Sequence, residues 1–289
     1  MPIIEPVIRP PAEADSFLLQ VTVGCSSNQC TFCAAYHTKP FRLKPQDEIL
    51  SDIEQRARRY PGTRRVFLLD GDALAMSDAQ LVPILEKLQQ SFPDLSRVAS
   101  YANGYNITHR TDEDLRQLAQ HGLKLIYVGL ESGSQEILDN CQKTATAKEM
   151  VIAVERVAKA GIKSSVIVLL GLGGKNDSPR HVQETIVALN AMQPRYLSFL
   201  TLMLIPGTLL FRQMQQGAFQ PLNTQELLQE ARAIIQGLEL QKTIFRSDHA
   251  SNYLPLEGRF PQDKIRLLGI LDQALQGKAL LRPEMLRGL

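Results

Sequence analysis

Three of the four cysteines of this chain lie within nine residues, in the segment Gly24-Cys25-Ser-Ser-Asn-Gln-Cys30-Thr-Phe-Cys33. Thiolates are ligands for zinc and for iron–sulfur clusters. Thiols gathered in one loop indicate metal binding, whereas a disulfide framework is spread over a chain in an oxidising compartment. The C-x4-C-x2-C spacing therefore predicts a metal site made by Cys25, Cys30 and Cys33.

Two metals fit this loop. An iron–sulfur cluster of four irons that is held only by protein takes four thiolates, but the fourth cysteine, Cys141, lies in a distant helical pattern and is expected to be a small buried apolar residue. Three thiolates leave one iron open, as a reactive cluster needs. The alternative is a structural zinc with His37 as its fourth ligand. Because structural zinc sites usually take ligands from two separate knuckles, the spacing favours the cluster.

Apolar runs typical of buried strands alternate along the sequence with amphipathic runs typical of helices, and these elements must position the loop. We expect strands at 16–23, 66–69, 97–102, 125–130, 163–170 and 196–204. Each is followed by a helical pattern, at 45–60, 78–92, 111–121, 134–160 with a break near Thr144, 178–192 and 209–216. Six consecutive β–α pairs predict an α/β fold with parallel strands, either a barrel or an open doubly wound sheet.

After residue 217 this rhythm changes, because helical patterns at 224–240 and 263–276 flank an irregular polar stretch. We expect a C-terminal helical cap on the same domain. The predicted organisation is an N-terminal extension at 1–15, the β–α domain at 16–217, and a helical extension at 218–289 that packs on it.

Composition excludes several classes of protein. Among 289 residues, 44% are hydrophobic and 21% charged, which excludes global disorder. The net charge of +2 and the absence of Trp do not favour binding to nucleic acid, so no nucleic-acid partner is expected. The N-terminal segment has no apolar core of a signal peptide, and the longest apolar runs are too short to span a bilayer. We expect a cytoplasmic protein with no membrane partner.

The cysteine loop resembles that of the radical S-adenosylmethionine (SAM) superfamily. The usual motif there is C-x3-C-x2-C with an aromatic residue before the last Cys, in the loop after the first strand of a partial (β/α)6 TIM-like barrel. Phe32 stands at the aromatic position, while the first spacing is one residue longer. The chain is most similar to a subgroup with this same C-x4-C-x2-C loop, related to the Elp3/MiaB/NifB-like set. The resemblance implies a [4Fe–4S] cluster on Cys25, Cys30 and Cys33, with SAM bound beside Phe32.

The resemblance assigns SAM contacts to two further strand ends. Asp70-Gly71-Asp72 resembles the acidic, Gly-rich turn that receives the amino group of SAM; the alternative is an ordinary β–α turn with Asp caps. The second strand end is Gly-Leu-Glu131-Ser132-Gly-Ser, in which the family's Glu helps to hold the cofactor. A Glu at the end of a buried strand is also costly without a partner, which favours a functional role. Lys143 matches a basic position that often contacts the SAM carboxylate.

Two more strand ends complete the expected SAM site. Gly171-Leu172-Gly173 corresponds to backbone that lies against the adenine, an approach that residues without a Cβ permit. Ser100 and Asn103, at the end of another strand, are candidate polar contacts. All these residues follow strands, where barrel enzymes build their active sites.

The polar stretch between the last two helices carries the only expectation about the substrate. It contains Arg246, His249 and Tyr253, and its composition is also typical of a surface loop. If it returns to the barrel mouth, His249 and Tyr253 are the candidate catalytic residues that donate a proton or hydrogen atom to a substrate radical. We expect His181 at the surface.

The resemblance implies an enzyme that reductively cleaves SAM to a 5′-deoxyadenosyl radical, which abstracts hydrogen from a substrate. It also implies a one-electron donor, a flavodoxin or a ferredoxin, and we expect a small-molecule substrate. Two alternatives stay open at this point. One is radical SAM modification of RNA or a peptide, and the other is a zinc or iron–sulfur binding protein without catalytic activity.

Overall fold

The computed structural model describes residues 3–288, which form two compact units. The first unit contains the described chain up to Asn28, then Cys33–Val128 and Ala153–Ser164. The second contains Gln29–Phe32, Gly129–Ile152 and the described chain from Ser165 onward. Three elements therefore run from one unit into the other along the chain: β6, α6 and β7.

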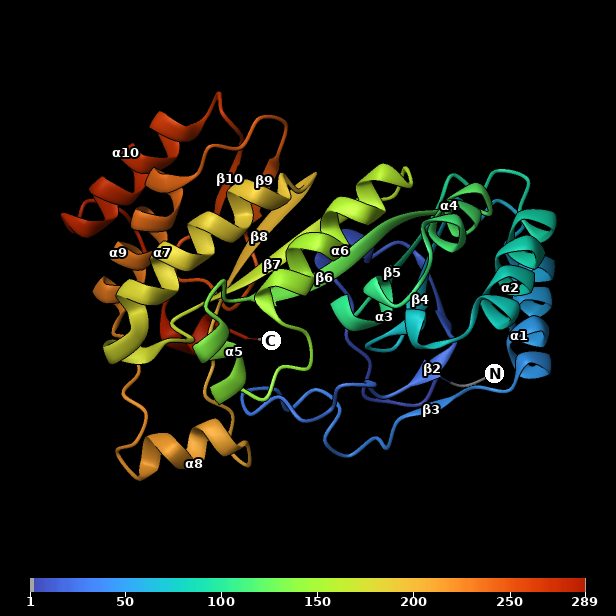
Figure 1. The fold of residues 1–289 in the computed structure, drawn as a ribbon, viewed down its shortest axis with the longest axis horizontal. Helices are drawn as coiled ribbons and strands as arrows, with labels where there is room; N and C mark the ends of the chain where they lie inside the picture. Colours follow the sequence, from blue (N-terminus) through green and yellow to red (C-terminus); the bar gives the residue numbers. More distant parts are fainter. Residues whose placement is uncertain (1–2, 289) are drawn as a thin grey trace. The chain divides into compact units, whose positions relative to one another are not determined.

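The described residues contain ten strands and ten α-helices, and Figure 1 shows their arrangement along the chain. The strands are β1 Phe17–Gln20, β2 Thr22–Val23, β3 Arg42–Leu43, β4 Arg65–Leu69, β5 Arg97–Tyr101, β6 Leu123–Glu131, β7 Lys163–Leu170, β8 Tyr196–Thr201, β9 Ile244–Ser247 and β10 Leu256–Arg259. The helices are α1 Gln46–Arg59, α2 Asp78–Ser91, α3 Gly104–Thr108, α4 Asp112–Gln120, α5 Gln135–Asn140, α6 Ala147–Lys159, α7 Gly174–Met192, α8 Leu209–Gln215, α9 Thr224–Gly237 and α10 Lys264–Leu275.

In the first unit, β1, β4, β5 and the start of β6 are parallel neighbours in that order. Residues of β4 are fully buried from Val66 to Leu69, as expected for a parallel strand covered on both faces. The rings of Phe67, Tyr101 and Tyr127 meet edge to face at centroid distances of 5.2–5.9 Å. Helices α1 and α2 pack against each other beside this sheet (Figure 1).

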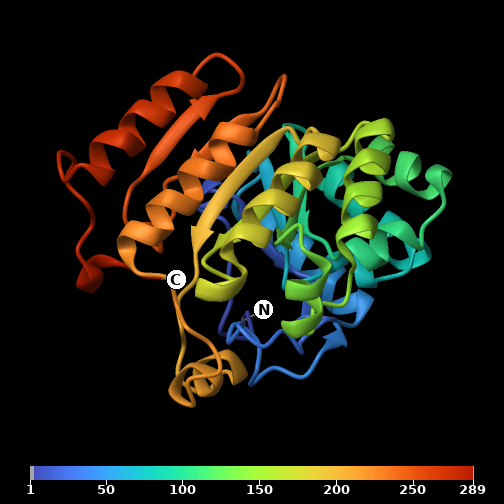
Figure 2. The same cartoon turned by 60° about the vertical axis from the view of Figure 1, so that its left-hand side comes forward.

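In the second unit, β7, β8 and β9 are parallel, and β10 pairs with β9 in the antiparallel direction. Phe199, Phe245 and Phe260 form its aromatic core through edge-to-face contacts. Helices α9 and α10 lie side by side, in orange and red in Figures 1 and 2. No helix within residues 3–288 is long and apolar enough to cross a membrane.

These elements confirm the predicted α/β class and the six β–α pairs. The break near Thr144 is real, since it separates α5 from α6. The C-terminal region differs from the expectation: both expected helices are present, but the polar stretch between them is not irregular, because it contains β9 and β10. The predicted domain boundaries at 15 and 217 stay a prediction.

The turn after β6 depends on a glycine that lies against α7. A Cβ on Gly133 would lie 2.2 Å from the carbonyl oxygen of Glu184 and 2.5 Å from the Cα of Thr185. Because both atoms are backbone, relieving the clash means moving the helix.

We therefore expect Gly133→Ala to lower the free energy of unfolding by about 2–3 kcal/mol in urea titrations followed by circular dichroism. Gly269→Ala is the matched control, since Gly269 lies within α10 with open space around it. It should gain about 0.5–1 kcal/mol from the better helix propensity of Ala. Equal stability of Gly133→Ala and the wild type would contradict this packing.

Candidate active site

The cysteine loop begins where β2 ends, and its first residue must be a glycine. Gly24 has φ +77°, and a Cβ there would lie 2.5 Å from the carbonyl oxygen of Lys39. Its own carbonyl oxygen accepts a hydrogen bond from the Gly71 amide at 3.1 Å. The loop that carries Cys25 is thereby joined to the turn after β4.

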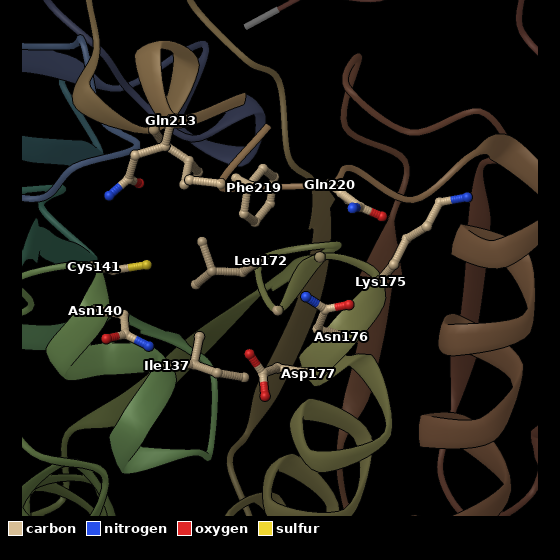
Figure 3. A pocket seen from close by; sticks show the side chains of 14 residues that line it. Ile137, Asn140, Cys141, Leu172, Lys175, Asn176, Asp177, Gln213, Phe219 and Gln220 are labelled. Carbon is tan, nitrogen blue, oxygen red and sulfur yellow. The ribbon is translucent and has the colours of Figure 1, made fainter. Parts of the chain in front are cut away.

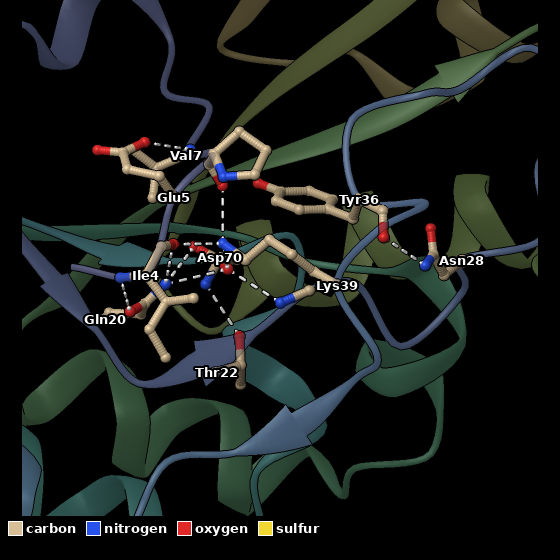
Figure 4. Close-up of polar contacts among 11 residues, drawn as sticks. Ile4, Glu5, Val7, Gln20, Thr22, Asn28, Tyr36, Lys39 and Asp70 are labelled. Carbon is tan, nitrogen blue, oxygen red and sulfur yellow. Dashed lines mark hydrogen bonds and ion pairs between the residues drawn. The ribbon is translucent and has the colours of Figure 1, made fainter. Parts of the chain in front are cut away.

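Asp70, the first acid of that turn, is fully buried and surrounded by donors (Figure 4). Its Oδ2 accepts from the Gly24 amide at 2.9 Å and pairs with the Lys39 Nζ at 2.7 Å. The side-chain amide of Gln20 donates to both carboxylate oxygens, and the Asp70 amide donates to the Thr22 hydroxyl. These contacts indicate that Asp70 holds Gly24, the residue before Cys25, in place. The sequence did not suggest this role.

Lys39 connects this carboxylate to the N-terminal segment. Its Nζ lies 2.6 Å from the Ile4 carbonyl oxygen and 2.7 Å from that of Pro6, in addition to Asp70. The three donors of the ammonium group thus have three acceptors, so the buried charge is fully solvated by protein. Sequence reasoning missed Lys39, because a lysine in a polar loop gives no sign of being buried.

Asp72, the second acid, holds the other side of Cys25. Its Oδ2 accepts from the Ser26 hydroxyl at 2.5 Å and from the Asn106 side-chain amide at 2.6 Å, and its Oδ1 accepts from the Asn103 amide at 3.2 Å. Burial raises the pKa of this carboxyl, and the three hydrogen bonds oppose that shift. The two acids therefore bond to the residues on either side of Cys25.

Gly71, between the two acids, lies against Cys25 itself. A Cβ at this position would lie 2.8 Å from the Cys25 Cβ, 3.2 Å from its Sγ and 3.0 Å from the Tyr36 ring. Tyr36 is buried, burial raises the pKa of its hydroxyl, and the hydroxyl has no hydrogen-bond partner within residues 3–288. A glycine cradle and an orphaned polar atom beside a cysteine are consistent with a bound group at this place.

In the second unit, the end of β6 presents the expected acid and base together. Glu131 Oε1 lies 3.0 Å from the Lys143 Nζ, and both side chains are largely buried. Glu131 has φ +62°, a left-handed conformation that costs a non-glycine residue about 1–2 kcal/mol. Its carboxylate folds over Gly129, where a Cβ would lie 2.0 Å from Oε1. Strain of this kind at a strand end is typical of functional sites.

Ser132 belongs to a buried hydrogen-bonded network that includes His181. The Nδ1 of His181 lies 2.8 Å from the Ser132 hydroxyl, and burial lowers the pKa of the imidazole to about 4. The expectation that His181 lies at the surface is wrong, because the side chain is fully buried. Its place in α7 follows from the helical period, which points this residue toward the strand ends.

Glu230, on α9, holds the expected adenine segment. Its Oε1 accepts from the Gly171 amide at 2.6 Å, and its Oε2 accepts from the Ser178 hydroxyl. Burial raises the pKa of Glu230 to about 7. Gly171 has φ +84°, and a Cβ there would lie 2.9 Å from the Leu227 side chain. Sequence reasoning missed Glu230, because it looks like any other acid of an amphipathic helix.

Leu172 and Gly173 line a cavity of about 190 Å³ in the second unit. Figure 3 shows the side chains of Cys141, Ile137 and Leu172 pointing into it from α5 and from the turn before α7. Phe32 packs against the same apolar cluster, and burial raises the pKa of the Cys141 thiol to about 11. The expected cofactor segment therefore does border a cavity.

The remaining candidates are placed as follows. Ser100 is fully buried, and its hydroxyl has no partner in the described part of the chain. Asn103 caps α3 by accepting from the Tyr105 amide. Tyr253 lines a second cavity of about 280 Å³. His249 is not among the residues lining that cavity, and its Nδ1 lies 2.9 Å from the Ser251 hydroxyl.

The three loop thiols are half-buried, whereas Cys141 is buried. Between residues 3 and 288, no three His, Cys, Asp or Glu side chains converge closely enough to mark a metal site by geometry. The assignment of Cys25, Cys30 and Cys33 as cluster ligands therefore stays a prediction, supported by the chemistry of the donor set and by the cradle at Gly71.

Comparison with known proteins identifies the family. The model of the Radical SAM superfamily matches residues 19–186. Heme chaperone HemW of Bacillus subtilis is 20% identical over 195 residues, which is 65% of this chain and 51% of that protein. The chain thus spans about half the length of this relative.

Two solved structures are similar in fold. The radical SAM methyltransferase TsrM of Kitasatospora setae, with cobalamin and a [4Fe–4S] cluster bound, has a TM-score of 0.54 and 20% identity over 67% of this chain and 38% of its own. Elp3 of Methanocaldococcus infernus has a TM-score of 0.55 and 13% identity over 92% of this chain and 64% of its own.

The chain belongs to the radical SAM superfamily, a superfamily of enzymes. This confirms the resemblance, the partial TIM-like barrel, and both expected cofactors, a [4Fe–4S] cluster and SAM. A one-electron donor and a substrate are general requirements of the family.

The hydrogen bonds of Asp72 predict a measurable effect on cluster retention. Asp72→Asn removes the charge that accepts from Ser26 and Asn106, and each such bond contributes about 1.5–3 kcal/mol. We expect an iron chelator to remove iron from the reconstituted variant several-fold faster than from the wild type, measured by absorbance. Asp112→Asn, which affects an exposed ion pair with Arg156, is the control and should behave as wild type. Equal release rates for Asp72→Asn and the wild type would show that Asp72 does not order the loop.

The raised pKa of Glu230 predicts a pH dependence of stability. Its proton is held more tightly in the folded state, so its contribution is present below pH 4.5 and is lost as the pH rises through about 7. Between pH 5 and 8, the wild type should lose about 2–3 kcal/mol relative to Glu230→Gln, by urea unfolding at each pH. A difference between the two proteins that does not vary with pH would contradict the burial of this carboxyl.

Proposed function

We propose that this chain reductively cleaves SAM and uses the product to take a hydrogen atom from a small-molecule substrate. The observation that carries the proposal is the clamp on the cysteine loop, in which Asp70 and Asp72 bond to the residues flanking Cys25 while Gly71 packs on it. Such a clamp orders one thiol in advance, as a cluster ligand requires.

Cys25, Cys30 and Cys33 would hold the [4Fe–4S] cluster, leaving one iron for the amino and carboxylate groups of SAM. When bound, the cluster and SAM supply one-electron cleavage of a C–S bond, which gives methionine and a 5′-deoxyadenosyl radical that takes hydrogen from the substrate. The protein positions the reactants and excludes water and oxygen.

The SAM contacts are proposed to come from residues that follow strands. Gly71 lacks a side chain at a place where a Cβ would collide with Cys25, and Glu131 with Lys143 offers a charged pair that can turn toward the amino acid end of SAM. The other proposed contacts are Phe32, Asp70, Asp72, Ser100, Asn103, Ser132, Gly171, Leu172 and Gly173. Besides any contact with SAM, Asp70 and Asp72 are proposed to position Cys25 through their hydrogen bonds to Gly24 and Ser26.

The balanced charge and the cavity beside Tyr253, which has both apolar and polar lining, support a small-molecule substrate. Tyr253 is the better placed of the two catalytic candidates, since it lines that cavity and His249 does not. The proposed electron donor is a flavodoxin or a ferredoxin, in the cytoplasm.

The test is anaerobic reconstitution with iron and sulfide, reduction with dithionite, addition of SAM, and mass spectrometry for 5′-deoxyadenosine. We expect its formation by the wild type and at least a hundredfold less by Cys30→Ala, because that variant lacks a cluster ligand. Tightly bound zinc and no 5′-deoxyadenosine from the wild type would overturn the proposal and favour a structural metal.

A further inference from the structure

The cavity beside Tyr253 combines an apolar wall with one polar end. Its volume is about 280 Å³, and Leu202, Met203 and Leu204, which follow β8, form the wall together with Leu222 and Leu227. These residues lie beyond the carboxyl end of a parallel strand, the edge at which α/β proteins bind their ligands. The wall suits an apolar ligand body.

The polar end consists of Tyr253, Glu284 and Arg287. The Arg287 guanidinium stacks on the Tyr253 ring at 3.9 Å and is almost fully buried, while its Nε donates to the Ser251 carbonyl oxygen at 2.7 Å. It is therefore held in place independently of its carboxylate partner. A buried, preoriented guanidinium is the group that proteins use to bind carboxylates.

Glu284 occupies the position that a bound carboxylate would take. One of its oxygens accepts from the Tyr253 hydroxyl at 2.5 Å, and Arg287 Nη1 lies 2.7 and 2.8 Å from the two oxygens. Burial raises the pKa of Tyr253, so its hydroxyl stays protonated and able to donate. The Glu284 side chain is 68% exposed, unlike its two partners. Because Glu284 is exposed, its carboxylate regains water when it leaves, and a ligand carboxylate can take its place on the buried guanidinium.

We propose that this cavity binds a substrate with an apolar body and a carboxylate, and that this carboxylate displaces Glu284 from Arg287 and Tyr253. The inference rests on the proposed function only in calling the ligand a substrate. Binding itself requires neither the cluster nor SAM. In the absence of the acid, Glu284 keeps the buried guanidinium paired.

The test is isothermal titration calorimetry of octanoate, a monocarboxylate with an eight-carbon chain, into the full chain reconstituted anaerobically. We expect octanoate to bind at least tenfold more tightly than octan-1-ol, because only the acid can pair with Arg287. Glu284→Ala should bind octanoate at least fivefold more tightly than the wild type, since its internal competitor is gone.

Variants of the two donors should act in the opposite direction. Arg287→Lys and Tyr253→Phe should each weaken octanoate binding at least fivefold, because Lys keeps the charge but loses the planar fork, and Phe keeps the ring but loses the hydroxyl. Asp272→Ala, which removes an exposed pair between α10 and α9, is the matched control and should bind as the wild type does. No binding of octanoate, equal affinity for octan-1-ol, or equal affinity of Glu284→Ala and the wild type would overturn the inference.

The same samples distinguish this inference from the proposed function. If 5′-deoxyadenosine forms but octanoate does not bind as expected, the carboxylate site is wrong and the radical SAM reaction stands. If octanoate binds but no 5′-deoxyadenosine forms, the site exists and the proposed function fails.

Discussion

The buried ion pair of Asp70 and Lys39 is the interaction on which the cysteine loop depends. An isolated charge in a protein interior is so costly that it survives only with a partner and with hydrogen bonds for its remaining donors and acceptors. Here the carboxylate is satisfied by Gly24, Gln20 and Lys39, and the ammonium group by two carbonyl oxygens of the N-terminal segment. Loss of either charge would leave the other unpaired, which costs about 3–5 kcal/mol in comparable sites.

The second unit also buries an acid and a base together, with the His181 Nε2 3.8 Å from the Glu230 Oε1. Glu230 and His181 are both fully buried, but burial drives their pKa values in opposite directions, toward a neutral acid and a neutral base near pH 7. Glu230, on α9, bonds to Gly171 after β7, and His181, on α7, bonds to Ser132 after β6, so each helix supports a strand end expected to meet SAM. In the proposed site, the C-terminal region therefore holds the Gly171 turn through Glu230 and binds the substrate carboxylate through Arg287.

Much of the fold could be predicted from local pattern, because buried parallel strands read as continuous apolar runs. The prediction for β7 at 163–170 agrees with the structure, and α1 and α4 agree within a residue at each end. Helix α7 begins four residues earlier than expected, since Gly174-Lys-Asn-Asp reads as a loop. Strands β9 and β10 were missed because each is only four residues long, too short for a clear sequence pattern, and each forms a strand by pairing with its neighbour.

The sequence could propose site residues where a motif and its chemistry coincide, as at the cysteine loop and at Glu131. The burial of Lys39, His181 and Glu230 could not be predicted. The partner that allows a polar residue of a loop or helix to be buried is brought close only when the chain folds. The family suggested that Asp70 contacts SAM, which stays a prediction, and the structure adds a bond from this carboxylate to the residue before Cys25.

The most direct test of the account is electron paramagnetic resonance of the reduced, reconstituted protein with and without SAM. The account predicts about four irons per chain, a reduced-cluster signal that changes when SAM is added, loss of that signal in Cys25→Ala, and its retention in Cys141→Ala. A signal that SAM leaves unchanged, or one that depends on Cys141 as much as on Cys25, would contradict a cluster with an open iron on this loop.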